Sequence, residues 1–96
     1  MKGIYTRVNS IEEADDLGHF IMRLGYEGVQ NDSYRYCKLQ MKSAIERNAR
    51  HHNPHCFVGV NGDRLVVGAN RKEMRRQLSM KYIEKERVFR NLVTRC

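Results

Sequence analysis

The sequence predicts an α+β domain with the element order β-α-α-β-β-α across residues 1–96. Three observations indicate this class: an alternating strand pattern near the start, two amphipathic helical segments after it, and an Asn-Gly turn between β-branched runs. A chain of 96 residues, 41% hydrophobic and 30% charged, is the size of one domain with a thin core. We expect a small antiparallel sheet and a long basic C-terminal helix.

The first strand is expected over residues 3–8, where β-branched side chains recur at every second position. A helix should follow, because Ser10 and Glu13 have the spacing of a capping box. Apolar residues then recur at helical spacing up to Leu24. Gly25 is suited to the left-handed conformation that ends many helices. These signals predict a strand and a helix packed on it.

A second helix and a hairpin complete the first two thirds of the chain. The polar turn at 31–33 offers an N-cap, and the helix should end before Pro54, since the residue preceding proline is pushed out of the helical region. Strands at 56–60 and 64–69 flank an Asn-Gly-Asp turn at 61–63. An Asn-Gly pair between β-branched runs is a strong hairpin signal.

The rest of the chain, residues 70–96, predicts a single long helix. Asn70 and Glu73 have the spacing of a cap, and an apolar stripe could pack on the hairpin. The stripe consists of Met74, Leu78, Tyr82, Phe89 and Leu92. A helix reaching Arg95 would be about 37 Å long. That exceeds what so small a domain covers, so we expect its end to project or to contact another chain as a homo-oligomer.

Charge is divided unevenly along the sequence. Residues 70–96 hold nine Lys/Arg and three Glu, a net +6 of the whole chain's +7, whereas residues 1–33 hold three basic and six acidic groups. Four of the cations crowd the first two turns of the expected long helix, where the macrodipole is positive and each cation costs roughly 0.3–1 kcal/mol. An anionic partner docked there would offset this cost.

The basic residues of the two later helices form the candidate partner-binding set. Its members are Arg71, Lys72, Arg75, Arg76, Arg35, Lys38 and Lys42. If their helices are neighbours, the set makes one positive surface, with tyrosines beside it for stacking on bases. The tyrosines are Tyr34, Tyr36 and Tyr82. Three interpretations stay open: an ordinary solvated face, a surface for nucleic-acid phosphates, and a docking site for an acidic protein.

Other chemistry has weaker signals. His51, His52, His55 and Cys56 are residue types that bind zinc, but their spacing fits no finger or ribbon, so a structural role competes with a metal site. The acidic residues at 12–16 suit a helix start better than acid–base catalysis. We expect no catalytic residues and no cofactor.

Three cysteines at irregular spacing imply no disulfide framework. The sequence also lacks a signal peptide and any apolar run near the ~20 residues of a membrane span. These features predict a soluble cytoplasmic protein with no membrane partner.

The strand at 4–8, the Ser-Ile-Glu-Glu-Ala-Asp stretch at 10–15 and the hairpin at 57–68 resemble the first half of the GNAT acyltransferase superfamily. The hairpin is similar to that family's valine-alanine-x-x-x-glycine-x-x-valine-glycine strand pair. The resemblance covers about residues 3–70 and implies acyl-CoA chemistry. The family holds the CoA pyrophosphate with an Arg/Gln-x-x-Gly-x-Gly/Ala loop at a helix start. No glycine follows Gly68 in this chain, so the resemblance implies a truncated relative of the kind suggested by small bacteriophage proteins.

The leading hypothesis is therefore a small non-enzymatic binding protein that engages an anionic partner, either nucleic acid or an acidic protein surface, through its basic C-terminal helix. A phage accessory factor would fit this description by analogy. The alternative hypothesis is a minimal or degenerate acetyl-CoA-dependent N-acyltransferase.

Overall fold

A computed structural model describes residues 3–25, 34–50, 53–62, 64–77 and 80–95. Its elements are β1 (Ile4–Val8), α1 (Ile11–Arg23), α2 (Tyr34–Ala49), β2 (Cys56–Asn61), β3 (Arg64–Gly68), the π-helical turn η2 (Glu73–Gln77), β4 (Lys81–Tyr82) and α3 (Lys85–Arg95). The strands form one sheet in the order β3-β2-β1-β4. The predicted α+β class is confirmed.

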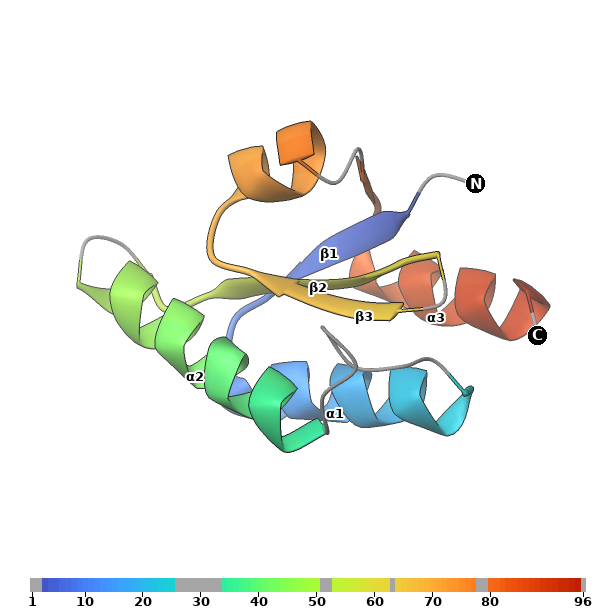
Figure 1. The fold of residues 1–96 in the computed structure, drawn as a ribbon, viewed down its shortest axis with the longest axis horizontal. Helices are drawn as coiled ribbons and strands as arrows, with labels where there is room; N and C mark the ends of the chain where they lie inside the picture. The colour runs from blue at the N-terminus through green and yellow to red at the C-terminus, as the bar shows by residue number, and fades with distance from the viewer. Residues whose placement is uncertain (1–2, 26–33, 51–52, 63, 78–79, 96) are drawn as a thin grey trace.

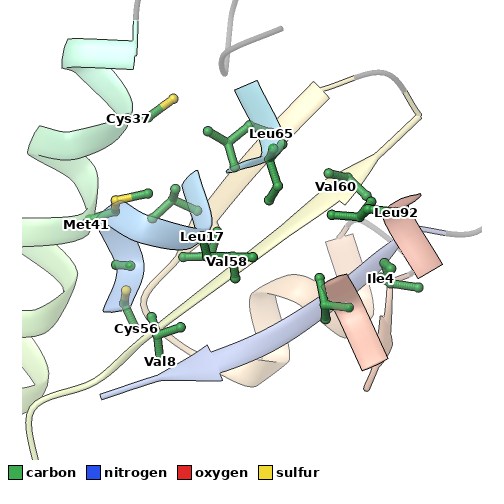
Figure 2. Close-up of a cluster of buried hydrophobic side chains, with 14 of the residues drawn as sticks. Ile4, Val8, Leu17, Cys37, Met41, Cys56, Val58, Val60, Leu65 and Leu92 are labelled. Carbon is green, nitrogen blue, oxygen red and sulfur yellow. The ribbon is translucent and has the colours of Figure 1, made fainter. Parts of the chain in front are cut away.

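Helices cover both faces of this sheet. Figure 1 shows α1 and α2 on one face and η2 on the other. The main core lies between the sheet and the three α-helices, and includes Val58 from β2, Leu17 from α1, Met41 from α2 and Leu92 from α3, as Figure 2 shows. Since all four side chains are fully buried, this face supplies most of the apolar burial that stabilises the fold.

The opposite face carries a second, smaller core under η2. Tyr5 and Phe57 point to this face from β1 and β2, and Met74 and Met80 cover them from the segment that contains η2. Alternation along a strand explains the division, because successive side chains point to opposite faces. Ile4 accordingly belongs to the main core and Tyr5 to the smaller one.

Three local signals in the first two thirds of the chain are confirmed: the Ser10 cap, the left-handed Gly25 and the turn at Gly62. The Ser10 Oγ accepts a hydrogen bond from the Glu13 N–H at 3.1 Å, and Gly25 has a φ of 98° after α1. Gly62 has a φ of 67° between β2 and β3, which pair in antiparallel register. The predicted cap at 31–33 lies outside the described residues.

The prediction of one helix from residue 70 to about Arg95 is wrong. The Asn70 side chain does accept from the Glu73 N–H at 2.8 Å, but the helical turn ends at Gln77 and the chain enters β4. Strand pairing lets Met80 enter the smaller core and Ile83 the main core, on opposite faces of the sheet. A continuous helix packed on one face of the sheet could not place these two side chains in cores on opposite faces.

The expectation of a purely antiparallel sheet is also corrected. β1 pairs with β2 in antiparallel register, but β4 runs parallel to β1. Two backbone hydrogen bonds flank this short pairing: the Lys81 N–H donates to the Gly3 oxygen at 2.8 Å, and the Ile83 N–H donates to the Tyr5 oxygen at 3.0 Å. Within the described residues, no helix is long and apolar enough to cross a bilayer.

Candidate anion-binding surface

The segment that contains η2 is fixed to the sheet through its two methionines. Met74 is fully buried, and its carbonyl accepts a hydrogen bond from the Met80 N–H at 3.0 Å. The fit is close, because a Cβ added to Gly68 would lie 2.7 Å from the Met74 sulfur. The turn therefore has one apolar side facing the sheet, and the side chains of Arg71, Lys72 and Arg75 are left to face solvent.

Three predicted cations of this segment are exposed: Arg71, Lys72 and Arg75. None of them forms an ion pair with a carboxylate in the part of the chain that the structure describes. Acidic side chains of α1 pair elsewhere, Asp15 with Lys38 at 3.9 Å and Glu13 with Lys85 at 3.5 Å. The fold thus does not use its acidic helix to neutralise these three charges.

An aromatic side chain lies beside these cations. Tyr82 is 40% exposed, and the Arg71 guanidinium lies 4.9 Å from its ring centroid. Behind it, the buried Tyr5 ring makes an edge contact at 5.5 Å and touches Phe57 in turn at 5.7 Å. Such T-shaped contacts are favourable for aromatic pairs. Tyr82 is therefore a partly exposed ring that is supported by two buried aromatic side chains, Tyr5 and Phe57.

We call Arg71, Lys72, Arg75 and Tyr82 the η2 surface. The side chain of Arg76, the fourth predicted cation of this segment, lies outside the described residues. Because η2 spans only five residues, the macrodipole cost predicted for a long helix does not apply at that size. What distinguishes these three cations is that they are exposed together, beside the Tyr82 ring and without carboxylate partners among the described residues.

The other predicted cations do not extend the η2 surface. Arg35, Lys38 and Lys42 lie on α2, across the sheet from η2 (Figure 1). Arg35 and Lys42 are exposed, and Lys38 approaches Asp15. A single continuous positive surface formed by both groups is therefore not observed.

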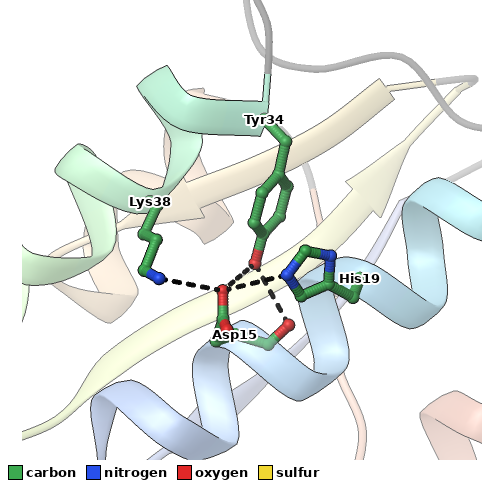
Figure 3. A network of polar contacts seen from close by, with 4 residues as sticks. All are labelled: Asp15, His19, Tyr34 and Lys38. Atoms are coloured by element: carbon green, nitrogen blue, oxygen red, sulfur yellow. Dashed lines mark hydrogen bonds and ion pairs between the residues drawn. The ribbon is translucent and has the colours of Figure 1, made fainter.

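Lys38 belongs to a polar network between α1 and α2, drawn in Figure 3. The Tyr34 hydroxyl donates to Asp15 Oδ1 at 2.7 Å, and His19 Nε2 lies 3.4 Å from the same oxygen. Burial first, and then the hydrogen bond to Asp15, raise the pKa of Tyr34. Tyr34 therefore stays a protonated donor, which suits a role in joining two helices better than a role as a base.

The packing beneath this network requires a glycine. A Cβ added to Gly18 would lie 2.6 Å from the Tyr34 hydroxyl oxygen and 2.9 Å from the Met41 methyl carbon. Gly18 thus allows the Tyr34 side chain to lie directly against α1. An open hollow of about 250 Å³ lies beside the network, lined by Ile11, Glu12, Asp15, Lys38 and Lys42.

The histidine-rich stretch provides no metal centre in the described residues. His51 and His52 lie outside them, and His55 Nδ1 lies 2.8 Å from the Asn53 carbonyl oxygen. Cys56 is buried, and burial raises the pKa of its thiol to about 12. No group of three or more metal-ligating side chains comes together among the residues whose placement is described.

Comparisons with known proteins add no relative to this description. No family model, curated protein or solved structure matches the chain. The GNAT resemblance and a phage origin therefore stay predictions.

Sequence reasoning missed the residues that support Tyr82. Tyr5 was seen only as part of a strand pattern, and its burial beneath Tyr82 depends on β4 pairing with β1. The alternating pattern at residues 3–8 does place Tyr5 on the face opposite Ile4, but only the fold shows that η2 covers that face.

Proposed function

We propose that this chain is a small binding protein that engages an anionic macromolecule through the η2 surface. One observation carries the proposal: Arg71, Lys72 and Arg75 are exposed together without a carboxylate partner among the described residues. Two carboxylates of α1 are occupied elsewhere, since Glu13 and Asp15 each have a cation within 4 Å. Unpaired cations held on a packed turn are ready to meet anions without rearranging the fold.

The mechanism is charge neutralisation. Each phosphate or sulfate that a cation contacts releases condensed counterions, so the binding constant falls with rising salt. Contacts of this kind set the position of a partner but do not read its sequence. A net charge of +7 adds a long-range attraction that raises the association rate.

Chromatography on immobilised heparin tests this proposal, because heparin supplies dense negative charge without bases or protein side chains. The test variant replaces Arg71, Lys72 and Arg75 with alanine. The matched control replaces Arg35, Lys42 and Arg87 with alanine; these three cations are also exposed but lie on α2 and α3. Both variants lose three positive charges, so a difference between them reports position rather than net charge.

The test variant should elute at clearly lower salt than the control, and the control should elute near the wild type. Circular dichroism and thermal melting establish that both variants are folded. Equal shifts for the two variants would contradict the proposal, because net charge alone would then account for binding.

A further inference from the structure

We infer that the partner of the η2 surface is a single-stranded nucleic acid, with an unpaired base stacked at Tyr82 while Arg71 and its neighbours hold the phosphates. This inference rests on the proposed function and names the partner class for the same surface. It depends on the one feature that charge neutralisation alone does not use, the exposed aromatic ring among the cations.

Tyr82 is unusual in its exposure. Among the described residues, the large apolar side chains that are exposed are Leu39 at 60% and Tyr82 at 40%. Leu39 lies on α2, away from η2, whereas Tyr82 lies under the Arg71 guanidinium. Once the Arg71 guanidinium moves from the ring onto a phosphate, the uncovered face of Tyr82 is open to a base, so base and phosphate have their preferred contacts at one place.

The contacts that hold the Tyr82 side chain in place favour stacking of a base on its ring. Tyr82 lies on β4, which the backbone bonds from Lys81 and Ile83 fix to β1, and its ring rests against the buried Tyr5. Because these supports are inside the fold, little side-chain freedom has to be lost when a base stacks. Arg71 lies on the other side of η2 in sequence, so the cation and the ring come together only in the folded chain.

The same geometry favours a single strand over a duplex or an acidic protein. In a duplex, each base face is covered by its neighbours, so an exposed tyrosine has no base face to stack on. An acidic protein would satisfy the cations but would have no use for the ring. Bases of any type have a π face, so we expect little sequence preference.

Fluorescence anisotropy provides the test, with labelled oligothymidine, a blunt oligothymidine–oligoadenine duplex of the same length, and polyglutamate as a competitor. Oligouridine run beside oligothymidine distinguishes RNA from DNA. The variants are Tyr82→Ala, Tyr82→Leu, Tyr82→Phe and Arg71→Ala, with Leu39→Ala as the control for loss of an exposed apolar side chain. Tyr82→Leu retains an apolar cover over Tyr5, so the aromatic contact can be tested even if Tyr82→Ala does not fold.

The wild type should prefer the single strand to the duplex. Tyr82→Ala and Tyr82→Leu should weaken single-strand binding by about 5- to 150-fold, the range for loss of one stacked base. Tyr82→Phe and Leu39→Ala should bind as the wild type does. Arg71→Ala should lower the slope of log K against log salt by about 0.7 for one lost phosphate contact, whereas the Tyr82 variants should keep the slope.

Equal affinity for single strand and duplex, with no effect of Tyr82→Leu, would overturn the inference. Displacement of oligothymidine by polyglutamate at comparable charge concentration would instead assign the surface to an acidic protein. Both results leave heparin binding dependent on the η2 surface. Failure of the proposed function itself would give a different result: the variant with alanine at Arg71, Lys72 and Arg75 would then bind heparin as well as the control variant does.

Discussion

A buried hydroxyl without a hydrogen-bond partner gives the sharpest test of the packing under η2. Tyr5 is fully buried, and its hydroxyl oxygen has no hydrogen-bond partner among the described residues. An unpaired buried hydroxyl costs about 1–3 kcal/mol. Tyr5→Phe removes this oxygen and retains the ring contacts with Phe57 and Tyr82. We therefore expect the free energy of unfolding to rise by about 1–2 kcal/mol.

The matched control is the tyrosine whose hydroxyl is paired. Tyr34 donates to Asp15 Oδ1 at 2.7 Å, so Tyr34→Phe deletes a made hydrogen bond to a charged group. We expect the free energy of unfolding of that variant to fall by about 1.5–3 kcal/mol. The same chemical change should thus have opposite signs at the two positions.

Urea denaturation at neutral pH measures both changes, and the m-value should stay constant because the surface exposed on unfolding is unaltered. In a thermal scan, each kcal/mol corresponds to a shift of about 4–8 °C for a domain of this size. If Tyr5→Phe destabilises the protein as much as Tyr34→Phe, the Tyr5 hydroxyl makes a hydrogen bond in solution and the reasoning is refuted.

Three further variants test other parts of the fold. Burial raises the pKa of the Cys56 thiol from 9.0 to about 12, so this thiol ionises at lower pH in the unfolded chain than in the folded one. The free energy of unfolding should therefore fall as the pH rises between these two values, by up to about 1.4 kcal/mol per pH unit. Urea titrations of Cys56→Ala should show a flatter pH dependence, and a pH dependence equal to that of the wild type would contradict this prediction. Gly18→Ala should lower stability by about 1–3 kcal/mol, because the new methyl would meet Tyr34, and a more stable variant by urea denaturation would count against the observed helix contact. Ser10→Ala should cost about 1 kcal/mol by removing the acceptor for the Glu13 N–H, and Ser10→Thr should restore most of it; equal losses in the two variants would exclude the cap as the cause.

Elements set by short-range signals could be predicted from the sequence. The cap at Ser10, the left-handed Gly25 and the Asn-Gly turn at Gly62 all act within a few residues, and the structure contains each of them. The cap of Asn70 on Glu73 was also predicted, although the element that it begins is only a short turn.

The break after η2 could not be predicted in this way, because β4 depends on pairing with β1, about eighty positions earlier in the chain. Only that pairing places Met80 and Ile83 on opposite faces of the sheet. A local reading of residues 70–95 finds helical spacing instead. Two residues of strand give no periodic pattern from which a sequence reading could start.

In the candidate site, too, the features that depend on local sequence could be predicted and the features that depend on the fold could not. Composition identified the basic segment, and the exposure of Arg71, Lys72 and Arg75 agrees with it. The separation of these cations from those on α2 depends on which sheet face each element covers, and this is a tertiary property. The approach of Arg71 to Tyr82 is likewise a tertiary property, because Tyr82 is placed by the pairing of β4 with β1.

The most direct test of the η2 surface is a nuclear magnetic resonance titration of isotope-labelled protein with inorganic polyphosphate. We expect the largest chemical-shift changes at the backbone amides and side chains of Arg71, Lys72 and Arg75 and at Tyr82. Arg35 and Lys42, two exposed cations of α2, should show only small shifts and serve as an internal control. Shifts centred on α2, or spread evenly over all exposed cations, would contradict the claim that this protein binds anions through the η2 surface.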